Sequence, residues 1–174
     1  PDKLTYIDEC GFKGCTNLTS IEFSNNLEEI YYEAFQGCTN LTSIEFPDTL
    51  RVIYDEAFSG CTNLAVTELP SNLEAIGEGA FTGCTNLAVT ELPSNLGSIG
   101  KEAFKGCANL ALSRLPARVT FVGEYAFQDC TNLTMMKLPG DLESIETGTF
   151  KGCNNLSFVE LPDGLRYIED EAFK

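Results

Sequence analysis

The chain has 174 residues, a hydrophobic fraction of 43% and a formal net charge of −15 at pH 7. This negative charge argues against nucleic acid or an anionic membrane surface as a partner, because both repel an acidic protein. The lack of histidine removes the commonest general base, the serine–histidine triad and imidazole metal sites. No apolar run approaches the ~20 residues that a membrane-spanning helix needs, so we expect no membrane insertion.

The chain begins and ends in mid-repeat. Pro1–Leu4 aligns with Pro47–Leu50, and the last residues stop partway through the same unit. We therefore interpret residues 1–174 as a single domain of about seven and a half repeats that forms part of a longer protein. On that interpretation the lack of a visible signal peptide is uninformative.

A Gly-Cys-Thr-Asn-Leu stretch first occurs at 14–18 and recurs, with small variations, every 23 residues as far as 152–156. An apolar segment follows it, in which Leu41, Ile44 and Phe46 fit a strand with alternate residues pointing inward. Pro47 ends that strand, because proline cannot donate to a ladder. Equivalent strands of successive units must run parallel at ~4.8 Å. The pattern predicts a concave parallel sheet of about seven strands.

The second half of each unit, such as 50–60, is too short for a long helix. Glycine pairs such as Gly77 and Gly79 indicate tight turns, a 3₁₀ segment or a short second strand on the convex side. Phenylalanine recurs once per unit, usually after alanine, at positions 12, 35, 58, 81, 104, 127, 150 and 173. Only a closed, stacked coil explains so regular a recurrence of large apolar residues.

Seven of the eight cysteines occupy one position of the repeat, which indicates a ladder of buried packing sites rather than a disulfide framework. Cys10 lies off this ladder. It is a candidate for an exposed reactive thiol or for a pair with Cys15, and truncation is an alternative explanation. The asparagine that follows the cysteine in every unit is expected to bond the backbone of its turn.

The stretches Ile76-Gly77-Glu78-Gly79-Ala80-Phe81-Thr82-Gly83-Cys84 and Ile99–Phe104 resemble the BspA-like, or Treponema pallidum-type, class of leucine-rich repeats. That class has a 23-residue unit with an I-G-x-x-A-F core followed by cysteine. The resemblance covers the whole chain and implies a leucine-rich-repeat solenoid. It also implies similarity to bacterial and protist surface adhesins that bind host or matrix proteins, although the class includes proteins of unknown role.

Departures from the repeat are where functional information is expected. The first outward ladder of the predicted sheet turns from polar to apolar along the stack: Ser20, Ser43, Val66, Val89, Leu112, Met135 and Phe158. An exposed apolar stripe of this kind often marks an interaction site. In the alternative interpretation, a local bulge turns Val66 and Val89 inward, because Thr67, Thr90 and Ser113 replace the usual inward isoleucine.

The second outward ladder is acidic for four rungs and then basic for two: Glu22, Glu45, Glu68, Glu91, Arg114, Lys137 and Glu160. We interpret the glutamates as a solvated face that keeps the protein soluble, and a cation or basic partner that relieves their repulsion is the alternative. Arg114 and Lys137, together with Arg118, form a basic spot. Since arginine and aromatic residues are enriched at hot spots, we expect Arg114, Lys137, Met135 and Phe158 to contact a partner, and drift within the array is the alternative.

Tyr31, Tyr32 and Tyr54 cluster on the other half of the early units. They form either a second contact patch or surface substitutes for the usual glycine. The cysteines lack the C-x-x-C pairs of a zinc site, and the sequence contains neither a phosphate-binding glycine loop nor a calcium-binding loop. We therefore expect no cofactor, no metal and no enzymatic activity.

The sequence thus predicts non-enzymatic protein–protein recognition through the concave face. The candidate contact residues are Val66, Val89, Leu112, Met135, Phe158, Arg114, Lys137, Glu68 and Glu91. The alternative is a structural spacer or scaffold subunit in a larger assembly. The resemblance implies the cell surface or secretion, and an intracellular location remains the alternative because buried thiols are compatible with the cytosol.

Overall fold

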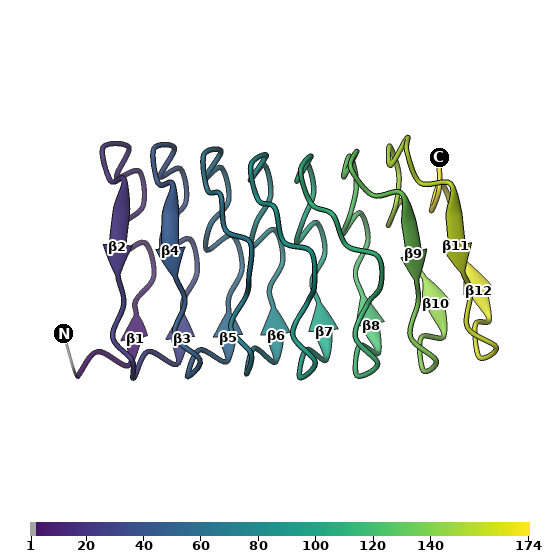
Figure 1. Ribbon diagram of the computed structural model, residues 1–174, viewed down its shortest axis with the longest axis horizontal. Helices are drawn as coiled ribbons and strands as arrows, with labels where there is room; N and C mark the ends of the chain where they lie inside the picture. Colours follow the sequence, from purple (N-terminus) through teal and green to yellow (C-terminus); the bar gives the residue numbers. More distant parts are fainter. Residues whose placement is uncertain (1–2) are drawn as a thin grey trace.

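The structure, a computed structural model, describes residues 3–174 and forms a solenoid of about seven stacked coils (Figure 1). No helix occurs within these residues. The alignment of Pro1 and Asp2 with Pro47 and Asp48 lies outside them. The predicted 23-residue solenoid is confirmed. Its strands are β1 (Tyr6–Ile7), β2 (Ser20–Glu22), β3 (Glu29–Ile30), β4 (Ser43–Glu45), β5 (Val52–Ile53), β6 (Ala75–Ile76), β7 (Ser98–Ile99), β8 (Phe121–Val122), β9 (Met135–Lys137), β10 (Ser144–Ile145), β11 (Phe158–Glu160) and β12 (Tyr167–Ile168).

The longest sheet comes from the second half of the unit. Its six two-residue strands pair in parallel in the order β1-β3-β5-β6-β7-β8, one strand per coil. Strands β10 and β12 form a further pair at the same position of the repeat. The second residue is buried in each of the six strands of this sheet and in β10. Of the alternatives open at this position, the structure therefore has a short strand followed by turns.

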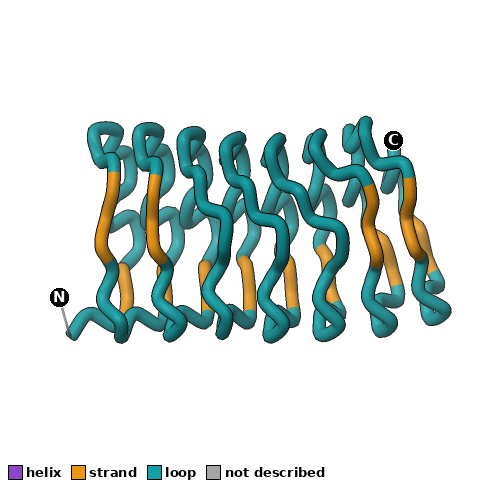
Figure 2. The backbone as a smooth tube through the Cα atoms, viewed as in Figure 1, coloured by secondary structure: helices purple, strands orange, loops and turns teal. Residues whose placement is uncertain are grey.

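The other half of the unit forms what we call the front face: residues 20–23, 43–46, 66–69, 89–92, 112–115, 135–138 and 158–161. Here β2 pairs with β4, and β9 pairs with β11, both in parallel. The three coils between them have no strand on this face (Figure 2). The expected sheet of about seven strands is therefore interrupted, and only its two ends are regular.

A phenylalanine stack runs through the core from one end to the other. Neighbouring rings, from Phe12 to Phe173, have centroids 5.0–5.6 Å apart and planes within 8° of parallel. Such aromatic pairs contribute about 0.5–1.5 kcal/mol each beyond the area they bury. The faithful phenylalanine in each unit is explained by this stack.

The repeated cysteines form a second core ladder. Cys61 Sγ donates to the Phe35 carbonyl at 3.1 Å, and the same bond recurs at Cys38, Cys84, Cys107, Cys130 and Cys153. Burial raises the pKa of Cys61 to about 12 and that of Cys153 to about 11. These neutral, bonded thiols have the packing role predicted for them. Cys10 and Cys15, in the first coil, are exposed and are not joined by a disulfide, so the prediction of a buried packing site is wrong for Cys15.

The repeated asparagine bonds the turn of the preceding coil rather than its own. Asn63 Nδ2 donates to the Thr39 carbonyl at 2.8 Å, and Asn155 Nδ2 donates to the Thr131 carbonyl at 2.7 Å. The residue therefore ties coils together, which is a structural role of the kind expected.

Candidate protein-binding face

The charged ladder lies on the front face and is exposed along its whole length. Glu22 is in register with Glu45, and Lys137 is in register with both Arg114 and Glu160. Glu68 and Glu91 are also exposed. The structure thus brings four of the expected contact residues, Glu68, Glu91, Arg114 and Lys137, onto one surface.

The apolar ladder is different, and the expected exposed stripe is wrong in its central part. Val66, Val89 and Leu112 have exposed fractions of 6%, 0% and 2%, so all three belong to the core. Met135 and Phe158 remain exposed at 42% and 55%. Only the last two of the five apolar contact candidates are therefore available to a partner.

The physical reason is a shift of one residue in the position of the apolar side chain. The end coils have an apolar residue at the middle position of the segment, as in Ile44, whereas the central coils have Thr67, Thr90 and Ser113 there. Burying a valine stabilises the fold by about 1.5–3 kcal/mol. Burying an unbonded hydroxyl costs about 1–3 kcal/mol. Both effects turn the preceding Val66, Val89 and Leu112 inward.

This shift opens the backbone ladder. The Ala88 N–H still donates to the Val66 carbonyl at 3.0 Å, and the Ala111 N–H to the Val89 carbonyl at 3.1 Å. Among residues 3–174, however, the backbone groups of 67–69 and 90–92 have no hydrogen-bond partner. Pairing resumes where the Leu115 N–H donates to the Lys137 carbonyl at 3.0 Å. The bulge that the sequence offered as an alternative is therefore the observed arrangement.

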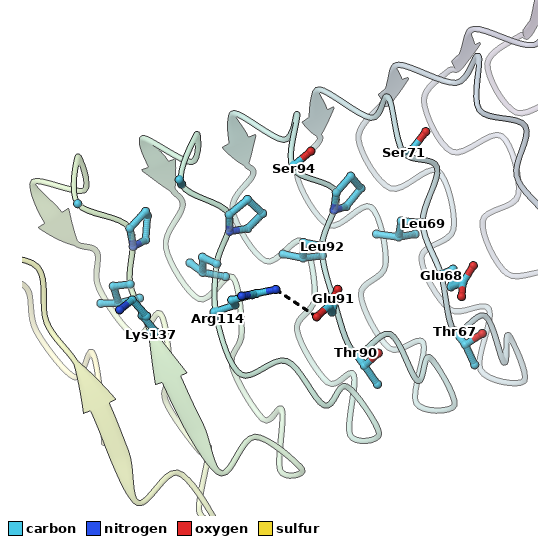
Figure 3. Close-up of a pocket in the computed structure, with 17 residues that line it drawn as sticks. Thr67, Glu68, Leu69, Ser71, Thr90, Glu91, Leu92, Ser94, Arg114 and Lys137 are labelled. Atoms are coloured by element: carbon cyan, nitrogen blue, oxygen red, sulfur yellow. Dashed lines mark hydrogen bonds and ion pairs between the residues drawn. The ribbon is translucent and has the colours of Figure 1, made fainter.

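An open groove of about 930 Å³ occupies the interrupted part of the front face (Figure 3). It combines two carboxylates, two cations, several hydroxyls and three prolines. It is lined by Thr67, Glu68, Leu69, Ser71, Thr90, Glu91, Leu92, Pro93, Ser94, Arg114, Leu115, Pro116, Ala117, Lys137, Leu138, Pro139 and Gly140. Val66, Val89, Leu112, Met135 and Phe158 do not line it, and neither does Arg118.

The charges in the groove are arranged as a dipole. Arg114 Nη2 lies 3.2 Å from Glu91 Oε1, as Figure 3 shows, and Lys137 Nζ lies 2.6 Å from Glu160 Oε1. Exposed pairs of this kind contribute only about 0–1 kcal/mol. Glu68 has no ion-pair partner within the described part of the chain. A partner with complementary charges can therefore displace these weak pairs at small cost.

The groove continues into a smaller hollow of about 380 Å³ on its acidic side. Glu45 and Glu68 line this hollow, together with Thr67 and Leu69. Across residues 3–174, no three histidine, cysteine or acidic side chains come together in a way that would hold a metal ion. No helix in the same residues is long and apolar enough to cross a membrane.

Sequence reasoning missed the groove itself. Its signal was nonetheless present in the segments Ala-Val-Thr-Glu, which occurs twice, and Ala-Leu-Ser-Arg. In each of them the apolar residue stands one position earlier than in Ser-Ile-Glu.

The 23-residue coil, the phenylalanine stack and the cysteine ladder define a leucine-rich-repeat solenoid. The sequence matches the family described as BspA type leucine rich repeat region over residues 1–111 and 63–174, so the chain belongs to that family. No curated protein sequence matches it.

Solved structures share the fold. A leucine-rich repeat protein from T. pallidum is 29% identical, with a TM-score of 0.66; the match covers 97% of this chain and 71% of that one. A leucine rich cell surface protein from Faecalibacterium prausnitzii is 24% identical, with a TM-score of 0.59, and the match covers 99% of this chain and 55% of that one. A leucine-rich repeat protein from Bacteroides ovatus is 21% identical, with a TM-score of 0.53 and coverage of 98% and 67%.

Proposed function

We propose that the protein recognises a protein partner through the front-face groove and has no enzymatic activity. The observation that carries the proposal is the groove itself, because it lies where the coils depart from the repeat and joins Glu68 and Glu91 to Arg114 and Lys137. The unpaired backbone groups of 67–69 and 90–92 add donors and acceptors that an extended segment of a partner can use.

A cell-surface or secreted location accompanies this proposal, with adhesion as the biological role. It is supported by family membership and by a structural neighbour that is described as a cell surface protein. The contacts we propose are Glu68, Glu91, Arg114 and Lys137 in the groove, with exposed Met135 and Phe158 beside it.

A rigid spacer is the second candidate, and a specific observation favours it. The segment from Gly60 to Leu73 is repeated without change from Gly83 to Leu96, and the phenylalanine stack is continuous through both. A spacer requires a regular stack of coils, and its function tolerates the loss of one coil. Deleting residues 61–83 therefore separates the two functions, since the deletion shortens the groove while keeping the register of the repeat.

The direct test is a charge reversal in the groove with a matched control outside it. Purified extracellular-matrix proteins are immobilised on a biosensor, and binding of the wild-type chain is compared with the Arg114→Glu/Lys137→Glu variant. The control is Lys101→Glu/Lys105→Glu, which changes the net charge equally at one exposed and one half-exposed ion pair, neither of which lines the groove.

We expect at least one matrix protein to bind the wild type, and the groove variant to bind it about tenfold or more weakly, as for loss of ~1.4 kcal/mol. The control variant should bind within about twofold of the wild type. Equal weakening in both variants, or no binding by the wild type, would contradict the proposal.

A further inference from the structure

Four tyrosines gather at the N-terminal end of the six-stranded sheet, and we call them the tyrosine patch: Tyr6, Tyr31, Tyr32 and Tyr54. Tyr6 lies in β1, Tyr31 and Tyr32 directly follow β3, and Tyr54 directly follows β5. These strands are neighbours in the sheet (Figure 1). None of the four residues lines the front-face groove. The patch is therefore a separate surface.

The rings of the patch contact one another. Tyr31 and Tyr54 stack at 4.8 Å between centroids and 8° between planes. Tyr32 lies 5.3 Å from Tyr54, and Tyr6 meets Tyr31 edge-on at 5.9 Å. Tyr6 and Tyr32 nevertheless keep 52% and 43% of their surface exposed. Core packing does not account for these two rings.

A single carboxylate is fixed at the edge of the patch. The Tyr31 hydroxyl donates to Glu29 Oε2 at 2.7 Å, and the Tyr54 hydroxyl donates to Glu29 Oε1 at 3.3 Å. The bond to Glu29 raises the pKa of Tyr31 to about 12. The two phenols act as donors only, so the negative charge of Glu29 is held beside the aromatic rings.

Acidic residues outnumber cations around the patch. Residues 1–100 contain 3 lysines and arginines against 15 acidic residues. Lys13 pairs with Glu33, and Arg51 pairs with Glu74 while also interacting electrostatically with Glu29. Lys3 makes no ion pair within residues 3–174. Asp8 and Asp55 follow the strands of the patch, and each accepts a backbone N–H rather than a cation. The patch thus presents aromatic faces within a negative field.

Aromatic faces carry negative electrostatic potential, and a guanidinium both stacks on them and pairs with carboxylates. We propose that the tyrosine patch binds an arginine-containing basic segment of a partner protein, with the guanidinium against Tyr6 or Tyr32 and close to Glu29. This surface acts independently of the groove. The two sites differ in charge, because the groove contains the cations Arg114 and Lys137. An acidic segment is disfavoured by charge, because Glu29, Asp8 and Asp55 repel it and Arg51 already pairs with Glu74.

The test uses isothermal titration with a short peptide that carries three arginines, against a peptide with glutamate in their place. The variant Tyr6→Leu/Tyr32→Leu removes the two exposed aromatic faces while keeping apolar bulk. Its matched control is Phe121→Leu/Tyr167→Leu, at rings that are 51% and 60% exposed and occupy the same strand position as Tyr6 in later coils. Melting temperatures verify that both variants fold.

We expect saturable binding of the arginine peptide to the wild type, a loss of about tenfold in the patch variant, and less than about twofold in the control. Binding should also quench tyrosine emission, since the chain has no tryptophan and four of its six tyrosines form the patch. Equal affinity in both variants would show attraction by net charge alone and would overturn the proposal. Absence of binding to the wild type, or equal binding of the glutamate peptide, would overturn it too.

Discussion

The two ends and the middle of the front face bury their apolar side chains from different positions of the repeat. In the end coils, Ile21, Ile44, Met136 and Val159 point toward the core from the middle of a regular strand, and the residue before each is exposed. In the three central coils, Val66, Val89 and Leu112 point inward one position earlier. The regular ends form paired strands, whereas the middle forms the groove.

Side-chain burial and strand pairing compete in deciding the local structure of this face. A solvent-exposed ladder bond contributes about 0.5–1.5 kcal/mol net, since water replaces it when it is lost. The gain from burying a valine is larger, at about 1.5–3 kcal/mol. Side-chain burial therefore overrides strand pairing on this face. The six-stranded sheet stays continuous because its inward residue is apolar in every coil, from Ile7 to Val122.

The largest expected effect comes from placing a charge at equivalent positions of the two regions. Val89→Asp buries a carboxylate in the core of a central coil, and we expect it to lower the free energy of unfolding by about 3–5 kcal/mol. Ser43→Asp places the same group at the same repeat position of an end coil, where the side chain is exposed. We expect that change to stay within about 0.5 kcal/mol. Urea unfolding followed by circular dichroism measures both, and equal effects would contradict the assignment of Val89 to the core.

Thiol reactivity tests whether the core ladder is the same in both regions. Cys38 belongs to an end coil and Cys84 to a central coil, yet both are buried and bonded to a phenylalanine carbonyl. We expect only Cys10 and Cys15 to react with a thiol reagent in the native protein, and the other six to react about a hundredfold or more slowly because they require opening of the coil. Rapid reaction of more than two thiols would show that the central coils are loosely closed.

The same thiols predict a pH dependence. Burial raises their pKa above the ordinary value of 9.0, to about 12 for Cys61 and about 11 for Cys153. Because the unfolded chain ionises first, this contribution to stability is fully present below pH 9 and is lost as the pH rises through the folded pKa values. Urea midpoints should therefore fall between pH 9 and 12. Replacing Cys61 with alanine should reduce the slope, and an unchanged slope would mean that the buried thiols do not account for it.

Restoring the residue order of the end coils in one central coil should restore part of the missing strand pairing on the front face. Val66→Ser/Thr67→Ile gives the third coil the order of Ser43 and Ile44, and we expect a third strand beside β4. Gain of one ladder bond, about 1 kcal/mol, should slow amide exchange in residues 66–69 about fivefold. Val66→Ser alone is the control, since it removes an apolar side chain without supplying another. Unchanged exchange in the double variant would mean that something other than side-chain order opens the ladder.

The smallest expected effect concerns the groove charges. Arg114→Ala removes an exposed pair with Glu91, and we expect the free energy of unfolding to change by less than about 1 kcal/mol. Lys137→Ala should behave alike in an end coil. A larger loss from either change, seen in thermal melts, would assign the groove charges to stability rather than to binding.

The sequence predicted the coil well because most of it depends on local, repeated information. The spacing of Phe35, Phe58 and Phe81 specified the stack, and the repeated cysteine specified a core site. The exposed charge ladder followed from the same alignment of units. Each of these inferences needed only the assumption that equivalent residues occupy equivalent places.

That assumption could not predict the groove, because the groove forms where equivalent residues of successive coils occupy different places. Aligning Ser43 with Val66 placed the valine on the outer ladder, although its apolar character opposed that place. Choosing between the two interpretations required comparing the free energy of burying Val66 with that of burying Thr67, which the alignment of units does not supply. The prediction of the tyrosine patch was also incomplete. The joint contact of Tyr31 and Tyr54 with Glu29 depends on the spacing between neighbouring coils.

Val89 faces the core and Thr90 faces solvent, and single cysteines at these two positions test that arrangement. In a Cys10→Ser/Cys15→Ser background, in which every remaining thiol is buried, Val89→Cys and Thr90→Cys are each exposed to a maleimide under native conditions. We expect the Thr90→Cys variant to be labelled rapidly and the Val89→Cys variant to be labelled only after unfolding. Rapid labelling of the Val89→Cys variant together with protection of the Thr90→Cys variant would contradict it.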